Sequence, residues 1–176
     1  MRFLKRILGA ARLDARTYED IEADRTSTGQ AALVIVLSSV AGGIGPITVN
    51  PPGLQGLIVG TLAALVGWTA WAIVTYYVGT RIFPQSQTQA DPGQLFRVIG
   101  FATSPGLLRV FGAIPGVARV VFVVASIWML AAMVVAVRQA LDYTTTARAI
   151  GVCVAGWVLS IVVALVIGLF FAPPVY

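Results

Sequence analysis

The segment from 54 to 78, LQGLIVGTLAALVGWTAWAIVTYYV, decides the fold of this chain. It contains no Asp, Glu, Lys or Arg, and its length exceeds the roughly 20 mostly apolar residues that a membrane-spanning helix needs. Backbone groups in a bilayer core must be satisfied within the segment, which favours a helix. The segment is therefore predicted to cross a membrane as one helix.

The composition of the whole chain supports the same conclusion. Of 176 residues, 58% are hydrophobic and 11% are charged, and the mean hydropathy is +0.89. A soluble domain carries about 45–50% apolar and about 25% charged residues. The composition therefore excludes a soluble enzyme and a disordered chain, and it indicates an integral membrane protein with a single domain.

Four other apolar segments lie before and after the segment at 54–78, and the five are numbered first to fifth in chain order. Pro46 lacks an amide donor and disfavours helix at the residue before it, so the helix of the earliest segment is expected to stop near Ile44. The third segment is the weakest, because it contains Arg97, Arg109 and a central Ser-Pro-Gly at 104–106. The predicted fold is an all-α bundle of five transmembrane helices, with four as the alternative if the third segment does not span. The four additional segments cover residues 31–49, 95–111, 117–137 and 149–171.

Lys and Arg in short loops predict the orientation, since cytoplasmic loops hold the excess. With five spans and a cytoplasmic N-terminus, Arg109 and Arg119 are the two basic residues outside and ten others lie inside. With four spans the count is again ten against two. Charge thus places the N-terminus in the cytoplasm, but it does not choose between five spans and four.

The first residues are predicted to form a short basic amphipathic helix suited to an anionic membrane surface. Chance periodicity combined with ordinary inner-side charge explains the pattern equally well. We divide the chain into a cytoplasmic segment, 1–29, and a transmembrane domain, 30–176. The apolar positions of the helix are Phe3, Leu4, Ile7, Leu8 and Ala11.

The sequence offers little for catalysis or metal binding. It contains no His, and its single cysteine, Cys153, lies in an apolar run and is expected to be a small buried hydrophobe. No HExxH, GxSxG or P-loop pattern occurs. We therefore expect no enzymatic activity, no cofactor and no metal. The net charge of +5 is explained by cytoplasmic loops rather than by nucleic-acid binding.

Ionisable residues near the bilayer are the candidate functional residues, because a charge at depth is usually paired or functional. Arg138 and Asp142 stand four apart, so a continuing helix would place them on one face as an ion pair next to Tyr143. Arg97 is expected to snorkel to an interface. For Arg109, snorkelling and a polar cleft around a helix broken at Pro105 are both open.

Small residues at four-residue spacing are the candidates for helix packing, because close approach drives helix association in lipid. They are expected to serve contacts within the chain rather than a dimer face. The positions are Gly56, Gly60 and Ala64 in the second segment, and Gly151 and Ala155 in the fifth.

Three polar stretches resemble prokaryotic members of the Yip domain family of Ypt/Rab-interacting membrane proteins. They are YEDIEADRTSTGQ at 18–30, GFATSPGLLR at 100–109 running into GAIPG at 112–116, and WMLAAMVVAVRQALDY at 128–143. The resemblance covers roughly residues 13–170 and implies five transmembrane helices, a cytosolic N-terminus and a short C-terminus outside. The long N-terminal region and the Asp-Leu-Tyr-Gly-Pro motif of eukaryotic members do not occur, so Rab GTPase binding is not expected.

Two functions are compatible with these observations. One is a scaffold or interaction protein of the cell membrane, with the lipid bilayer, a second copy or other membrane proteins as partners. The other is a small transporter or channel-like carrier with a path around the broken third helix. Transporters usually line their path with several polar groups, and Arg109 stands nearly alone, so the scaffold is favoured.

Overall fold

The computed structural model describes residues 2–44, 53–114 and 116–171, and every element in these ranges is helical. Most elements are α-helices, while η1 is a π-helix and η2 is a 3₁₀-helix. In chain order they are α1 (Arg2–Ala11), α2 (Ala15–Ala23), α3 (Ser27–Ile44), α4 (Gly53–Tyr77), η1 (Val78–Ile82), α5 (Pro92–Ala102), η2 (Ser104–Ala113), α6 (Ala118–Ala140) and α7 (Thr146–Phe171).

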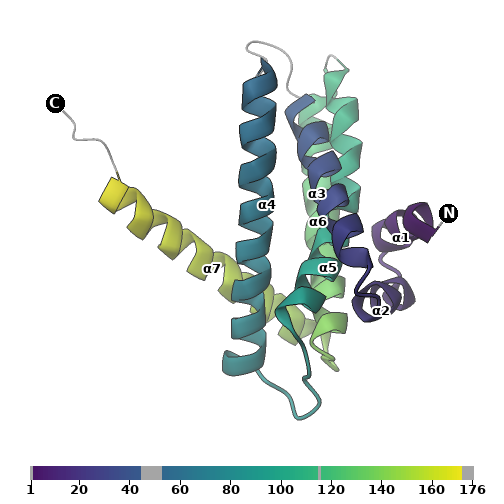
Figure 1. The fold of residues 1–176 in the computed structure, drawn as a ribbon, viewed down its shortest axis with the longest axis vertical. Coiled ribbons are helices and arrows are strands. Elements are labelled where there is room, and N and C mark those ends of the chain that lie inside the picture. The colour runs from purple at the N-terminus through teal and green to yellow at the C-terminus, as the bar shows by residue number, and fades with distance from the viewer. Residues whose placement is uncertain (1, 45–52, 115, 172–176) are drawn as a thin grey trace.

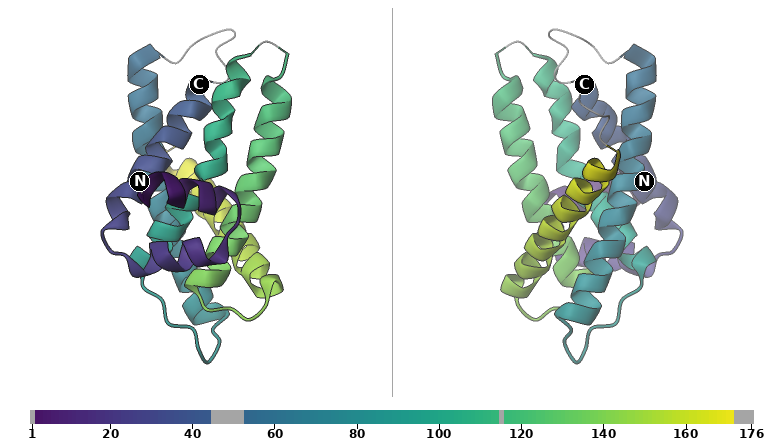
Figure 2. Two further views of the ribbon diagram at one scale, coloured as in Figure 1. Left: turned by 90° about the vertical axis from the view of Figure 1, so that its right-hand side faces the viewer. Right: turned by 90° about the vertical axis from the view of Figure 1, so that its left-hand side faces the viewer.

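Four rods form a bundle along the long axis of the molecule (Figure 1). They are α3, α4, α6 and the combined rod of α5 and η2; α3 and α4 lie against each other and against the α5–η2 rod, while α6 lies against the α5–η2 rod. The α5–η2 rod contacts all three of its neighbours, so the segment with the weakest hydropathy lies in the centre. The remaining elements flank this bundle: α1 and α2 cross one side, and α7 leaves at an angle (Figures 1 and 2).

The expected helix boundaries agree closely with the observed ones. α3 ends at Ile44 as predicted, although it begins at Ser27, four residues before the apolar run. α4, α6 and α7 match the predicted second, fourth and fifth segments to within a few residues. The part of the first segment beyond 44 lies outside the described residues.

The third segment contains the break expected at Pro105. α5 starts with a capping box, in which Asp91 accepts from the Gln94 backbone at 2.9 Å and the Gln94 side chain accepts from the Asp91 amide. The helix ends at Ala102, and the chain continues as the tighter 3₁₀ form over Ser104–Ala113. The Gly100 carbonyl accepts from the Thr103 amide at 3.2 Å and from the Thr103 hydroxyl at 2.7 Å, so one residue caps the end of the interrupted helix with both of its donors.

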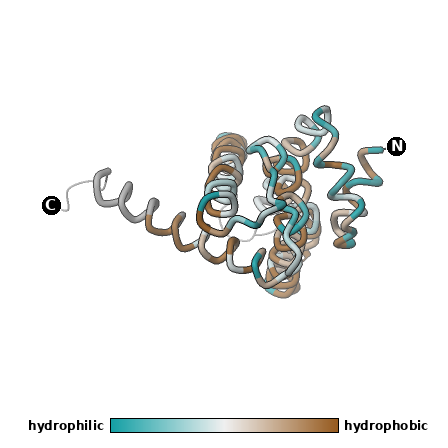
Figure 3. The backbone as a smooth tube through the Cα atoms, turned by 90° about the horizontal axis from the view of Figure 1, so that it is seen from below, coloured by the Kyte–Doolittle hydropathy of each residue, from teal (hydrophilic) through white to brown (hydrophobic). Residues whose placement is uncertain are grey.

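The rods differ in whether they are long and apolar enough to cross a membrane. α4 with η1 and α6 are long and apolar enough to cross a bilayer, while Ser27–Gly43 and Thr146–Leu159 are shorter apolar helical stretches. Leucine, valine and isoleucine side chains stay exposed along the outer faces of α4, α6 and α7, from Leu54 to Ile73 on α4 for example. Seen from below, these rods are largely hydrophobic, and polar residues gather on α1 and α2 (Figure 3). A belt of this kind is what lipid covers.

Candidate functional site

Arg109 lies in η2 and points between the rods of the bundle. Its Nη2 donates to the Ser126 hydroxyl of α6 at 3.0 Å, and its guanidinium carbon lies 5.2 Å from the centre of the Phe122 ring. A methyl group at Gly42 of α3 would lie 3.8 Å from the Arg109 Cδ, so a glycine makes room for the arginine stem. The arginine is therefore accommodated by three elements.

No acidic side chain accompanies Arg109. All seven Asp and Glu residues of the chain lie in α2, in the short turns that flank α2, or in the loops that precede α5 and follow α6. The Arg109 Nε is buried and has no hydrogen-bond partner among the described residues. The guanidinium therefore retains a donor that protein groups do not use.

The Arg109 side chain lines a cavity of about 260 Å³. The other walls come from α4, α6 and α7 and are mostly aromatic or thioether side chains. A second, almost wholly apolar groove of about 360 Å³ runs between α6 and α7 and shares Leu130, Met133 and Trp157 with the first. The other residues around the Arg109 cavity are Trp68, Ser126 and Met129.

Arg97 does not snorkel to an interface as expected. It is 5% exposed, and its Nη2 donates to the main-chain oxygen of Glu22 in α2 at 2.6 Å. The reason is that α2 packs over α5 and brings a carbonyl to the arginine. A prediction made from the sequence of one helix does not include such a contact with another. Arg97 thus attaches α2 to the bundle.

The basic helix predicted at the N-terminus is present as α1, and it forms with α2 an antiparallel pair, here called the N-terminal hairpin (Arg2–Ala23). The apolar face of α1 is divided between the protein core and the exposed surface. Phe3 and Ile7 pack against the buried core, and Phe3 meets the Phe101 ring edge-on at 6.3 Å, whereas Leu4 and Leu8 are 64% and 56% exposed. Half of the face assigned to lipid is therefore used for protein packing.

Arg6 holds the hairpin together. Its Nε and Nη2 lie 2.8 Å from Asp20 and Asp24, and Nη1 donates to Gln30 at 3.2 Å. Within the described ranges these are the only two ion pairs. Hydrogen bonds from Thr26, together with the Arg6 guanidinium, lower the pKa of Asp24 to about 2. Sequence reasoning missed this cluster, although Asp20 in α2 and Asp24 at its C-cap stand four apart in the sequence.

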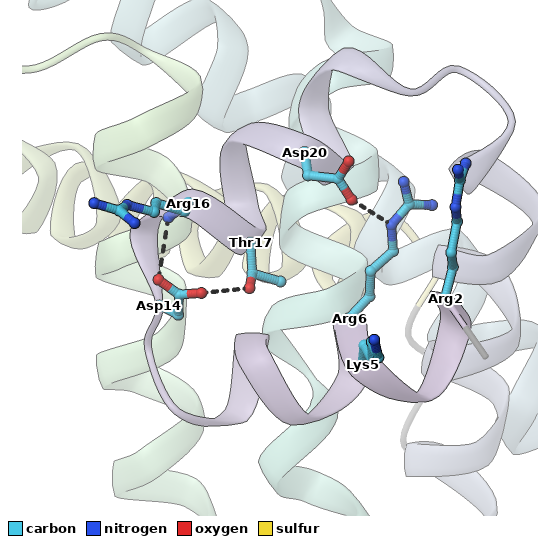
Figure 4. Close-up of a pocket in the computed structure, with 7 residues that line it drawn as sticks. All are labelled: Arg2, Lys5, Arg6, Asp14, Arg16, Thr17 and Asp20. Atoms are coloured by element: carbon cyan, nitrogen blue, oxygen red, sulfur yellow. Dashed lines mark hydrogen bonds and ion pairs between the residues drawn. The ribbon is translucent and has the colours of Figure 1, made fainter.

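Four basic side chains, Arg6 among them, border a hollow between α1 and α2 (Figure 4). Arg2, Lys5 and Arg16 are exposed, while Asp14 is engaged as the cap of α2, accepting from the Thr17 hydroxyl at 2.6 Å. The hollow therefore carries net positive charge. The helices approach closely because α1 has a glycine, Gly9, against Thr17.

The hairpin is bonded to the flank of the bundle. Trp128 of α6 donates to the Ala11 carbonyl at 2.7 Å, and Gln139 of α6 donates to Glu19 at 3.1 Å. Burial and the nearby Asp142 carboxylate raise the pKa of Glu22 to about 7, although Arg97 opposes the shift. The hairpin and the bundle are thus one folded unit in the described structure.

The predicted Arg138–Asp142 ion pair is wrong. α6 ends at Ala140, and Asp142 has a φ of 52°, so the two side chains no longer share a helix face. Arg138 instead binds the main-chain oxygens of Tyr143 and Thr144 at 3.2 and 3.3 Å, which is the usual role of a basic residue at a helix C-terminus.

Tyr143 has a structural role that its sequence position did not specify. Its hydroxyl lies 2.9 Å from the Gly79 carbonyl oxygen and 2.8 Å from that of Phe83. These acceptors belong to η1 and the residue after it, so Tyr143 ties the end of α6 to the end of the α4–η1 rod.

The predicted small-residue contacts are only partly observed. A Cβ at Gly60 or Gly151 would meet nothing within 4 Å among the described residues, because the upper part of α4 faces outward and α7 diverges (Figure 1). Gly56 is half-buried, Ala64 lines a hollow with Trp157, and Ala155 packs on the core.

The close approaches occur at other glycines. A Cβ at Gly100 would lie 2.8 Å from that of Ala31, and one at Gly106 would lie 2.9 Å from the Met129 sulfur and collide with Ser38. Both glycines lie in the α5–η2 rod, which explains how this rod fits between its neighbours.

Comparison with known proteins supplies one match. A family model described as the Yip1 domain matches residues 14–168. No curated protein and no solved structure shows a significant match. The matched residues include α2, the whole bundle, the Arg109 cavity and most of α7.

Proposed function

Because this chain belongs to the Yip1 domain family of membrane proteins, we propose that it is a non-enzymatic scaffold of the cell membrane that holds partner membrane proteins at the cytoplasmic face. In this proposal five segments cross the bilayer: α3, α4 with η1, the α5–η2 rod, α6 and α7. The N-terminus is cytoplasmic and the C-terminus is outside.

Two observations support the five-span topology. The α5–η2 rod lies alongside α3, α4 and α6, and its ends lie at opposite ends of the bundle (Figure 1). The loops before α5 and after α6 meet at one end, where Gln87 donates to the Asp142 carbonyl at 3.1 Å. A third segment that enters at this end and leaves at the other is what a complete crossing requires.

The observation that carries the scaffold proposal is the N-terminal hairpin. It is fixed to the bundle through Arg97, Trp128 and Gln139, and it presents the basic hollow of Arg2, Lys5 and Arg16. A rigidly held basic surface suits an acidic segment of a partner protein, since complementary charge speeds and orients association. The exposed Leu4 and Leu8 suit the adjacent lipid surface.

A transport path is less well supported by the same structure. Continuous paths through a membrane protein are lined by successive polar groups. The charged or hydroxyl side chains around the Arg109 cavity are Arg109 and Ser126, while the adjoining groove is lined by apolar side chains and Cys153. This arrangement favours a binding cavity over a passage.

Site-specific photo-crosslinking in native membranes tests the scaffold. A photo-reactive amino acid at position 16 should give a discrete protein adduct, and Arg2→Glu with Lys5→Glu should abolish that adduct. The same amino acid at Gln87, an exposed loop residue, is the control and should give none. Adducts to lipid alone, or equal protein adducts at 16 and 87, would refute the proposed role of the hairpin.

Cysteine labelling tests the topology. Cys153 is replaced by Ser, single cysteines are placed at Gly116 and at Thr145, and intact cells are treated with an impermeant maleimide. The cysteine at 116 should be labelled and that at 145 should not. The reverse pattern would show that the third segment does not cross.

A further inference from the structure

The Arg109 cavity and the α6–α7 groove are adjacent and differ in chemistry. The cavity has a guanidinium and a hydroxyl at one end, and the groove is apolar. Leu130, Met133 and Trp157 line both, so the two hollows meet at these three side chains. The groove, at about 360 Å³, falls within the range of about 300–1,000 Å³ typical of small-molecule sites.

We propose that this site binds an anionic amphiphile, with its carboxylate or phosphate at Arg109 and Ser126 and its hydrocarbon chain in the groove between α6 and α7. The proposal goes beyond the scaffold role and does not depend on it. It concerns α6, α7 and η2, whereas the scaffold surface is the hairpin.

The charge of the head group follows from the surroundings of Arg109. A buried cation without a counter-ion is unfavourable, and the chain places all its acids elsewhere. Ser126 lies eight residues into α6, which is about 12 Å from the start of that helix at a rise of 1.5 Å per residue. The polar end of the cavity is therefore away from the helix end, and an anionic oxygen there would accept a charge-assisted hydrogen bond from the Arg109 guanidinium that lines it.

The hydrocarbon part of the ligand follows from the groove. Ile150, Val154 and Trp157 of α7 are exposed and face the groove across from Leu130 of α6. α7 diverges from the bundle (Figure 2), and in the described structure Leu130, Ile150 and Val154 are 44%, 48% and 57% exposed. A chain of methylene groups is flexible enough to fill such a surface.

A second copy of the protein is a poorer occupant. A copy in the same orientation would present, at the depth of Arg109, the same helices without any Asp or Glu. It would cover the apolar groove but leave the guanidinium unpaired. An amphiphile satisfies both parts of the site, and a free anion satisfies only one.

The test is native mass spectrometry combined with photo-crosslinking on the full-length protein in nanodiscs. The probes are a photo-reactive oleate, a photo-reactive phosphatidylglycerol and, as the zwitterionic comparison, a photo-reactive phosphatidylethanolamine. Wild type should retain an anionic probe and crosslink at α6 or α7 residues of the groove. Preference for oleate or for phosphatidylglycerol identifies a carboxylate or a phosphate head group.

Three variants make the result specific. Arg109→Gln should reduce retention of the anionic probe at least tenfold, while Arg119→Gln, an exposed arginine at the start of α6, should leave it unchanged. Val154→Trp fills the groove at a residue that does not line the Arg109 cavity and should also reduce retention, which keeps the test valid if Arg109→Gln fails to fold. Equal retention in all four proteins, equal binding of the zwitterionic probe, or chain-to-chain crosslinks in place of lipid adducts would overturn the proposal.

Discussion

Replacing Arg6 by Gln should release α1 from α2 without unfolding the bundle. The Arg6 side chain is 5% exposed, whereas those of its partners Asp20 and Asp24 are 63% and 28% exposed. Breaking a fully buried pair costs about 3–5 kcal/mol, and an exposed pair contributes about 0–1 kcal/mol. Because the carboxylates regain water when Arg6 is lost, an intermediate value of about 2 kcal/mol applies.

This free energy corresponds to a change of about 30-fold in the equilibrium between the intact hairpin and a hairpin in which α1 has come away from α2. Hydrogen exchange in nanodiscs measures it directly: amides of α1 and α2 should exchange about 30-fold faster, and those of α6 should not change. Arg12→Gln, an exposed arginine in the same segment, is the matched control. Equal exchange in the two variants would show that Arg6 does not hold the hairpin.

The following three predictions concern the protonation of Glu22, the hydrogen bonds of Tyr143 and helix packing at Gly106. The pKa of Glu22 is raised to about 7, so docking of the hairpin on the bundle is strongest below the ordinary carboxyl pKa and weakens as the pH rises through 7. Glu22→Gln should remove this pH dependence from the amide hydrogen exchange of the hairpin, measured between pH 5 and 8. Tyr143→Phe should destabilise the protein by about 1–3 kcal/mol and so lower its melting temperature in detergent, because the hydrogen bonds of the buried hydroxyl to Gly79 and Phe83 are lost. An unchanged melting temperature would contradict the proposed role of Tyr143 in joining α6 to the α4–η1 rod. Gly106→Ala should destabilise by about 1–3 kcal/mol through collision with Ser38 and Met129, whereas Gly60→Ala, which meets no described neighbour, should be neutral or slightly stabilising; equal effects would refute the packing argument.

Hydropathy predicted the rods because each is long enough for its apolar residues to dominate. The boundaries of α4 and α6 follow, to within a few residues, from the apolar runs. The break at Pro105 followed from the missing amide donor. These properties belong to one segment at a time, so a single sequence contains them.

Contacts between segments were not predictable in the same way. Arg6 and Arg97 were read as surface or interfacial charges, and both are buried because α2 folds back over the bundle. The Arg138–Asp142 pair failed because it required α6 to continue beyond Ala140. Gly106 and Gly100, rather than the regularly spaced Gly60 and Gly151, make the close contacts, since the topology decides which face of a rod meets another.

The broken third rod has a consequence for biogenesis. In the five-span arrangement the segment carries two arginines and a Pro interruption, and an arginine at the centre of an inserting helix costs about 2.5–3.5 kcal/mol. Its final surroundings include the Glu22 carbonyl from a preceding helix and Ser126 from a following one. The translocon therefore meets this segment before one of its polar partners has been synthesised, and stable integration has to wait for α6. Truncated nascent chains that stop before residue 118 should leave the third segment accessible from the cytoplasm, and chains extended through 140 should bury it.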